Sequence, residues 1–334
     1  MNRKALLAVS TVAAVLVATP ALATSTRTYV SNGGSDANAT FSCDFAHPCR
    51  TFAAALAQTT AGGEILAIDS SGYGRLVIDR SVSILAAPGA YAGIGVGAAG
   101  NATGIEIATA GVDVVLRGLT LTGQGGNFGI GMTAGNSLFV ENCVISDFAG
   151  GAGIMAGGSA WVRVIDSVIR RNGTGAAFTG GAHVLVSGSR FLNNSGNGVE
   201  ASSDSVDMTR LSVERSVASG NGGVGFLASS KDTGAAQMAI VDSVAEGNGT
   251  GVLAEVQNTG SVEASVADSL VAANGNGIMV SGAGAKMVVG GNAVTKNGLG
   301  LGQASAGQLR SDGTNSVNDN TTETSGTVST FGRM

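Results

Sequence analysis

Apolar and polar residues alternate with a period of two in short segments between residues 105 and 304. In each segment one residue separates two apolar positions, as in Ile105 and Ile107 or Val252 and Ala254. This spacing places both side chains on one face of a β-strand and does not fit a helical period. The pattern therefore predicts short strands with one buried face. The other pairs are Ile130/Met132, Ile154/Ala156, Ala176/Phe178, Val199/Ala201, Phe226/Ala228 and Ile278/Val280.

A second set of apolar pairs shows that these segments belong to a repeat. Each pair lies three and five residues before a small residue, and the small residues recur every 22 to 27 positions. One repeat cannot bury its apolar face alone, whereas stacked repeats share one core. The expected fold is all-β, a single-stranded right-handed parallel β-helix with coils about 4.8 Å apart. The small residues are Gly118, Cys143, Ser167, Ser189, Ser216, Ser243, Ser269 and Asn292.

An asparagine follows the small residue by five positions in the last six repeats. Stacked coils place these asparagines above one another, where each amide can donate to one neighbour and accept from the other. Such bonds contribute about 0.5–1.5 kcal/mol each. The sequence predicts a structural column of Asn172, Asn194, Asn221, Asn248, Asn274 and Asn297, which the earlier repeat interrupts with Phe148.

The first residues indicate export. A basic start (Arg3, Lys4), an apolar run and the small residues 21–23 are typical of a secretory signal peptide. We expect a periplasmic or extracellular protein with no membrane span, because no later apolar run is long enough. The chain has a formal net charge of −5, which argues against nucleic-acid partners. Abundant glycine with three prolines, none after Pro88, suits a long hydrogen-bonded stack.

The stretch 28–89, with its TYVS, SDAN, PCRTF, GGEIL and GYG segments, resembles the start of secreted bacterial β-helix proteins of the pectin-lyase-like superfamily. The resemblance implies a short helix that closes the cylinder, with Phe52, Ala55 and Leu56 facing the core. It implies little about activity, since this fold carries lyases, hydrolases, epimerases, adhesins and inert proteins. The expected organisation is signal peptide 1–23, cap 24–64, β-helix 65–304, and a last coil or flexible tail 305–334.

The cysteines fit an exported protein. Cys43 and Cys49 are expected to form a disulfide that pins the cap. His47 lies between them, but two thiols and one histidine lack a fourth ligand, so we predict no metal site. Cys143 occupies the column of small residues and is expected to be buried.

No intact catalytic signature of the superfamily is present. The sequence contains no Asp-Asp pair and no Gly-His-Gly, and it suggests no cofactor. A divergent lyase, glycoside hydrolase or epimerase would need an unfamiliar set such as Asp166, Arg163 and His183. A carboxylate column of Asp166, Asp242 and Asp268 has two interpretations: a cation or paired-carboxylate site, or simple turn capping.

Outward positions of the third strand of each repeat suggest a binding surface. Trp161, His183 and Arg210 should stack across consecutive coils, with Phe139 and Arg163 beside them. An indole can stack on a sugar ring, and Arg and His can donate to hydroxyls or carboxylates. We interpret this strip as a glycan-binding face, although exposed strands carry mixed side chains in any case.

A second outward column is apolar and suggests self-association or cover by the tail, through Leu227, Leu253 and Met279. Taken together, the patterns favour a secreted, non-catalytic binding or structural β-helix associated with glycans or the cell envelope. The alternatives are a divergent polysaccharide-active enzyme and a surface adhesin.

Overall fold

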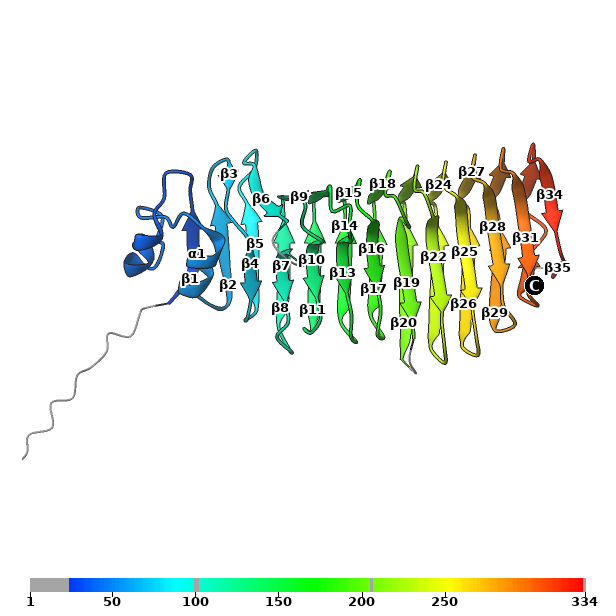
Figure 1. Ribbon diagram of the computed structural model, residues 1–334, viewed down its shortest axis with the longest axis horizontal. Helices are drawn as coiled ribbons and strands as arrows, with labels where there is room; N and C mark the ends of the chain where they lie inside the picture. The colour runs from blue at the N-terminus through cyan, green and yellow to red at the C-terminus, as the bar shows by residue number, and fades with distance from the viewer. Residues whose placement is uncertain (1–23, 99–101, 205–206, 333–334) are drawn as a thin grey trace, which may run out of the picture.

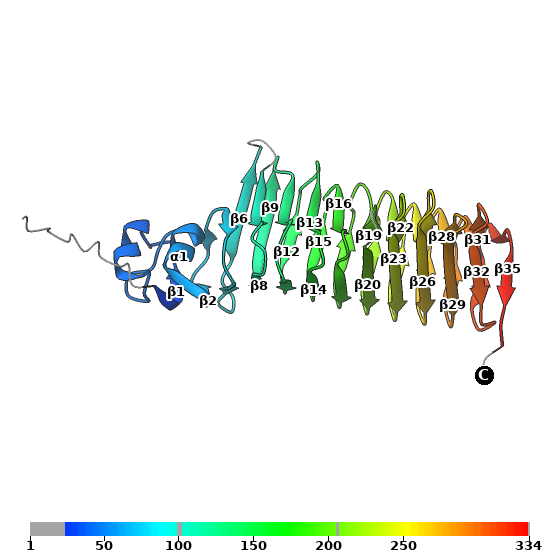
Figure 2. The same ribbon diagram turned by 90° about the horizontal axis from the view of Figure 1, so that it is seen from below.

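The computed structural model describes residues 24–98, 102–204 and 207–332 of the 334-residue chain. The predicted signal peptide, 1–23, lies outside the described residues. The chain winds into a long right-handed coil with three parallel sheets along its length (Figures 1 and 2). This confirms the predicted β-helix.

Sheet 1 has 13 strands and runs the whole length of the cylinder. Its strands pair in parallel, each with the strand one coil earlier and one coil later. They are β1 (Ser25–Val30), β2 (Thr59–Ala67), β5 (Val82–Ala86), β8 (Asp113–Arg117), β11 (Ser137–Glu141), β14 (Trp161–Ile165), β17 (His183–Ser187), β20 (Met208–Glu214), β23 (Ala235–Val241), β26 (Ser261–Ala267), β29 (Ala285–Gly290), β32 (Gln308–Ser311) and β35 (Val328–Thr330).

Sheet 2 follows sheet 1 in each coil and has 11 strands, most of them three residues long. They are β3 (Ser71–Gly72), β6 (Ala92–Gly97), β9 (Leu119–Gln124), β12 (Val144–Ser146), β15 (Val168–Arg170), β18 (Arg190–Leu192), β21 (Val217–Ser219), β24 (Val244–Glu246), β27 (Leu270–Ala272), β30 (Ala293–Thr295) and β33 (Ser316–Asn318).

Sheet 3 completes the coil with another 11 strands. The predicted apolar pairs with one residue between them lie here and face the core. Ile130, Ile154 and Ile278, for example, are fully buried. The strands are β4 (Leu76–Ile78), β7 (Thr103–Ile107), β10 (Phe128–Met132), β13 (Ala152–Ala156), β16 (Thr174–Phe178), β19 (Val199–Ser203), β22 (Val224–Ser230), β25 (Thr250–Val256), β28 (Asn276–Ser281), β31 (Leu299–Ala304) and β34 (Thr322–Ser325).

In the coils from β12 to β30, the strands of sheet 2 are short because a left-handed residue lies on each side of them. Asp242 (φ 49°) precedes β24 and Gly247 (φ 65°) follows it. The left-handed conformation turns the chain sharply, and Gly, Asn and Asp adopt it most readily. Every coil from β12 to β30 has this pair of corners. The first column of corners is Asn142, Asp166, Gly188, Arg215, Asp242, Asp268 and Gly291; the second is Asp147, Arg171, Asn193, Gly220, Gly247, Ala273 and Lys296.

From Asp166 and Arg171 onward, a buried polar residue follows each corner, and together these residues build two ladders along the cylinder. In the asparagine ladder, the Nδ2 atom of Asn221 donates to Oδ1 of Asn248 (2.8 Å), and its backbone N–H donates to the same oxygen (3.0 Å). In the serine ladder, the N–H of Ser216 donates to Oγ of Ser243 (3.2 Å). The side chains thus satisfy the buried polar groups at both corners of each coil.

The asparagine ladder ends at Phe148, which occupies the position that asparagine holds in the later repeats. The N–H of Phe148 donates to Oδ1 of Asn172 at 3.1 Å, but its ring offers no further partner. The ring is fully buried and fills the space above Gly123 and Gly129. Toward the C-terminus the ladder continues through Asn297 to Asn320 (2.9 Å). Aromatic packing thus replaces amide hydrogen bonding toward the N-terminus.

A column of glycines lets the coils approach closely beside this ladder. A Cβ atom at Gly225 would lie 2.7 Å from the carbonyl oxygen of Gly251 and 3.0 Å from Nδ2 of Asn248. Side chains do not tolerate such contacts with backbone atoms. Glycine after the Asn turn is therefore a packing requirement of the stack.

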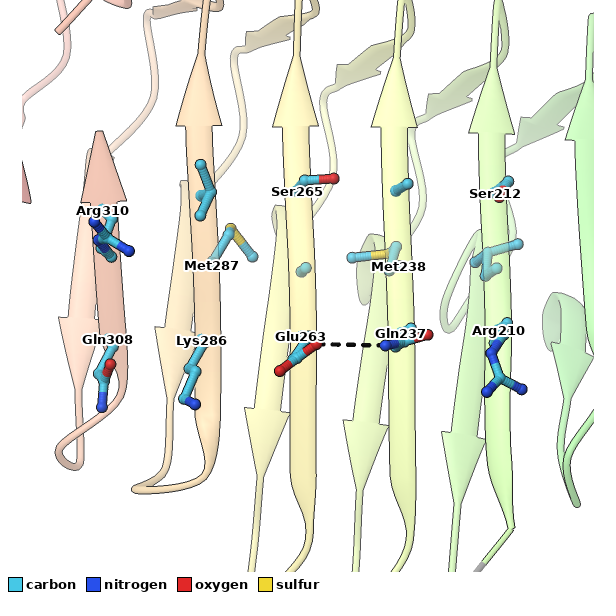
Figure 3. Close-up of a pocket in the computed structure, with 14 residues that line it drawn as sticks. Arg210, Ser212, Gln237, Met238, Glu263, Ser265, Lys286, Met287, Gln308 and Arg310 are labelled. Atoms are coloured by element: carbon cyan, nitrogen blue, oxygen red, sulfur yellow. Dashed lines mark hydrogen bonds between the residues drawn. The ribbon is translucent and has the colours of Figure 1, made fainter. Parts of the chain in front are cut away.

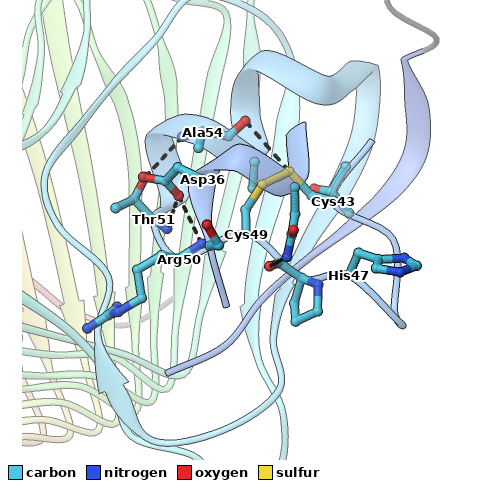
Figure 4. The surroundings of a disulfide bond; sticks show 12 residues. Asp36, Cys43, His47, Cys49, Arg50, Thr51 and Ala54 are labelled. Carbon is cyan, nitrogen blue, oxygen red and sulfur yellow. Dashed lines mark hydrogen bonds between the residues drawn. A yellow bond between two sulfur atoms is a disulfide. The ribbon is translucent and has the colours of Figure 1, made fainter. Parts of the chain in front are cut away.

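The N-terminal end is closed by the cap that the resemblance implied. Helix α1 (Phe52–Gln58) buries Phe52, Ala55 and Leu56, and a 3₁₀ turn, η1 (Asp36–Phe41), precedes it. The predicted disulfide between Cys43 and Cys49 is confirmed, with their Cα atoms 5.0 Å apart (Figure 4).

Hydrogen bonds attach the disulfide segment to the start of α1. Asp36 accepts from the N–H groups of Arg50 and Thr51 (2.9 Å each), and Oγ1 of Thr51 accepts from the N–H of Ala54 (3.2 Å). Thr51 is thus the N-cap of the helix. The first turn of α1 therefore starts from a fixed position against the disulfide.

The cylinder continues to the last described residues. Strands β32 to β35 stack on the coil before them, so residues 308–330 form regular coil structure. Within the described ranges, no helix combines the length and apolar character needed to cross a membrane.

Candidate functional site

The outer face of sheet 1 collects the residues that the sequence singled out. Val162 and Val164 point into the core, so Trp161 and Arg163, which alternate with them along the strand, point outward. Parallel pairing then extends two outward columns along the cylinder. The first contains Ser137, Trp161, His183, Arg210, Gln237, Glu263, Lys286 and Gln308; the second contains Phe139, Arg163, Leu185, Ser212, Ala239, Ser265, Val288 and Arg310.

At one end of this face lies an aromatic cluster. The rings of Trp161 and His183 stack, with centroids 4.5 Å apart and planes inclined by 24°. Nη1 of Arg210 donates to Nε2 of His183 at 3.4 Å. Trp161 is 60% exposed, and with Phe139 and Arg163 it lines a shallow hollow of about 280 Å³. The predicted strip is therefore one continuous surface.

A larger groove of about 590 Å³ continues from Arg210 toward the C-terminus. Its floor carries the small outward side chains of Ser212, Ala239 and Ser265, which leave a depression beside the larger residues of the first column. Figure 3 shows Arg210, Gln237, Glu263, Lys286 and Gln308 in a row along one side, each from a successive strand.

The groove is locally basic in a chain that is acidic overall. Arg210, Lys286 and Arg310 line it, against the single carboxylate of Glu263, which accepts a hydrogen bond from Gln237 Nε2 (3.3 Å). Strands β20, β23, β26, β29 and β32 supply these side chains at a spacing of about 4.8 Å. A regularly spaced row of polar and charged side chains, with Glu263 as its one carboxylate, suits an extended ligand that lies along the cylinder.

Comparisons with known proteins agree with the β-helix fold. A family model described as "Right handed beta helix region" matches residues 98–239. The solved structure of pectate lyase Pel9A is similar with a TM-score of 0.59, covering 86% of this chain and 77% of that one at 20% identity. The chain therefore has the right-handed parallel β-helix fold.

Two further comparisons give no additional support for the fold or the function. A rhamnogalacturonan lyase structure is matched with a TM-score of only 0.34, at 11% identity, over 85% of this chain and 75% of that one. No curated protein matches the sequence significantly.

In this β-helix protein the three predicted carboxylates lie at corners between sheets 1 and 2. Asp166, Asp242 and Asp268 are exposed and have φ of 48–49°, so their residue type is explained by the left-handed turn. Gly188 and Arg215 separate Asp166 from Asp242 in this column. Across the residues that the structure describes, no three His, Cys, Asp or Glu side chains gather as a metal site would require.

The alternative catalytic set does not come together either. His183 and Arg163 lie on the face of sheet 1, whereas Asp166 is at the corner beyond it. Asp113, at the other end of the first column, accepts from Ser137 Oγ (2.6 Å) and Asn136 Nδ2 (2.7 Å). These two hydrogen bonds hold the pKa of Asp113 below its ordinary value, so it is ionised at neutral pH.

The prediction that the apolar column is exposed is wrong for Leu227. Only 7% of this side chain is accessible, and Leu253 and Met279 are half-buried. Large side chains in adjacent coils cover one another, because neighbouring strands lie only about 4.8 Å apart. Self-association through this column stays a prediction, with less apolar surface to support it.

Sequence reasoning placed Trp161, His183 and Arg210 in the right column but missed the groove that continues from Arg210. The signal was the second column, where Ser212, Ala239 and Ser265 follow the larger Phe139, Arg163 and Leu185. A change from large to small outward residues marks where the surface is hollowed.

Cys143 is buried, and burial raises the pKa of its thiol to about 11.

Proposed function

We propose that this protein binds an acidic polysaccharide along the outer face of sheet 1 and does not cleave it. The observation that carries the proposal is the basic groove of Arg210, Lys286 and Arg310, continuous with the Trp161–His183 stack. Carboxylates on a polymer would pair with the basic side chains, and a sugar ring would stack on the indole.

The comparison with a pectate lyase supports this ligand class, because pectate is a polymer of acidic sugars. Export also supports it, since extracellular polysaccharides meet only exported proteins. The predicted signal peptide and the Cys43–Cys49 disulfide are both typical of the periplasm or the cell exterior. We therefore infer a role at the cell envelope or outside the cell.

The distribution of carboxylates argues against cleavage by hydrolysis. Glycoside hydrolysis generally uses two carboxyl groups on either side of the scissile bond. Glu263 is the one acidic side chain among the residues that line the groove, and it is flanked by Gln237 and Lys286. The aspartates of the corner column are not among the residues that line the groove, and the left-handed turns explain their residue type.

The test is a titration with oligogalacturonates and, for comparison, neutral oligosaccharides. Trp161 is the only tryptophan, so its fluorescence reports directly on this face. Acidic oligomers should perturb the emission, and added salt should weaken the binding. The double variant Lys286→Gln, Arg310→Gln should lose about tenfold in affinity.

A matched control is Lys231→Gln, which removes an exposed charge in a loop outside the groove. It should bind like the native protein. No binding of any acidic oligomer would refute the proposal. Accumulation of shorter or unsaturated products would replace it with the alternative of a divergent polysaccharide-active enzyme.

A further inference from the structure

A second aromatic surface lies on the cap, far from the groove in sequence. The segment 38–49, here called the cap loop, carries Phe41 and Phe45, which are 54% and 68% exposed. Aromatic residues make up only 4% of the chain, and most phenylalanines of the coils are buried. Two exposed phenylalanines in one short loop are therefore unexpected for a purely structural cap.

The exposed rings are paired with neighbours in defined geometries. Phe41 stacks on His47, with centroids 4.4 Å apart and planes inclined by 21°. Phe45 meets the ring of Tyr29 edge to face at 5.4 Å and 80°. The cap loop thus presents flat apolar surfaces whose orientation is fixed by a second ring.

The backbone of the cap loop is also held in place. The Cys43–Cys49 disulfide closes it, and Nδ2 of Asn38 donates to the carbonyl of Pro48 at 2.8 Å. The loop also extends the backbone bonding of β1, because the N–H of Tyr29 donates to the carbonyl of Cys43 (2.8 Å) and the carbonyl of Tyr29 accepts from the N–H of Cys49 (2.9 Å). A preorganised surface loses little conformational entropy when it binds a ligand.

Polar groups border the rings. Oδ1 of Asp44 accepts from the backbone N–H of His47 at 2.7 Å and lies 3.1 Å from its Nδ1. Figure 4 shows the His47 ring turned away from the disulfide. The backbone hydrogen bond from His47 is the main reason that the pKa of Asp44 lies below its ordinary value. The edge therefore combines a carboxylate acceptor with an imidazole.

We propose that the cap loop is a second carbohydrate-binding site, for neutral sugars, with Phe41 and Phe45 as stacking surfaces and Asp44 and His47 as partners for hydroxyl groups. Residues 38–49 contain no Lys or Arg, and the neighbouring Arg50 donates to Gly72 O (2.8 Å) and Ser71 Oγ (3.0 Å). Apart from the His47 imidazole, which lies against Asp44, the cap loop has no basic side chain, so its carboxylate disfavours an acidic sugar. The site stands independently of the groove on sheet 1.

The experiment is an array of neutral gluco-, manno-, galacto- and xylo-oligosaccharides probed with the full protein, followed by calorimetric titration of the strongest binder. Phe45→Ala should weaken the interaction by about tenfold. Its side chain is exposed, so folding should be unaffected. Trp161 fluorescence should stay unchanged, because Trp161 is on sheet 1.

Tyr91→Ala is the matched control, since Tyr91 is 51% exposed but lies outside the cap loop. This variant and the groove variant Lys286→Gln, Arg310→Gln should both bind the neutral sugar normally. Absence of any signal on the array, or equal binding by native and Phe45→Ala protein, would overturn the proposal. So would self-association in sedimentation that Phe45→Ala abolishes while no sugar binds, because the surface would then be a contact between copies.

Discussion

The repetitive coils of the cylinder and its N-terminal end are stabilised in different ways. From Asn172 onward each coil contributes to the same two ladders, one of amides and one of serines, at its two corners. Before Phe148 no such repeat holds, and a disulfide, a helix and contacts between residues far apart in sequence close the end. Repetition stabilises the middle of the stack, but the end needs a unique structure, since its first coil has no neighbour on one side.

Phe148→Asn tests the junction between the packing of the Phe148 ring and the asparagine ladder. The variant extends the asparagine ladder by one position, yet we expect the free energy of unfolding to fall by about 4 kcal/mol. The buried ring packs above Gly123 and Gly129, and an amide would leave a cavity there. Chemical denaturation measures the effect. A stabilised variant would mean that the ladder, and not ring packing, governs this junction.

Asn221→Ala tests the ladder itself. The amide of Asn194 and its backbone N–H both donate to Oδ1 of Asn221, so two buried donors lose their acceptor. We expect a loss of about 3 kcal/mol in unfolding free energy. Asn258→Ala, at an exposed loop, is the control and should change little. Equal effects of the two substitutions would argue that the ladder is a by-product of stacking.

Replacing both Cys43 and Cys49 by Ser tests the unique end. The loop they close is short, with a sequence separation of 6, so we expect a loss of about 2 kcal/mol. Faster amide hydrogen exchange should be confined to the cap loop and α1 and should spare the ladder coils. Uniformly faster exchange along the cylinder would contradict the division into two regions.

Acid should loosen the same end first. Burial disfavours ionisation of Asp69, but hydrogen bonds from Tyr73, Ser31 and the Asn32 N–H outweigh it and lower its pKa. Stability from this group is therefore present above about pH 4, the unfolded pKa, and is lost as the pH falls through the lower folded-state value. Asp69→Asn should reduce the acid sensitivity of cap exchange. An unchanged profile would contradict the assignment.

These regions also differ in how much the sequence could predict. The repeat predicted the strands, the inward columns and the positions of the stacked asparagines, because each copy obeys the same local rules. The sequence showed that Phe148 interrupts the asparagine column, but it did not show that ring packing replaces the ladder there. The cap came from a resemblance and not from a pattern, since contacts such as Asp69 with Tyr73 and Ser31 have no counterpart in other coils.

The candidate site shows the same limit. Register predicted that Trp161, His183 and Arg210 would be neighbours, because pairing in a regular stack follows from the repeat. The groove, the burial of Leu227 and the stacking of Phe41 on His47 depend on side-chain volumes in several coils at once. Such properties need three-dimensional packing and cannot be read from one column of residues.

The central functional claim is that an acidic polysaccharide lies on sheet 1. The most direct measurement is a crystal structure of the protein with a bound galacturonate oligomer. We expect density for the oligomer along the row from Trp161 to Arg310, with carboxylates beside Arg210 and Lys286. An oligomer bound only elsewhere on the cylinder, or no bound oligomer at saturating concentration, would contradict the proposed function.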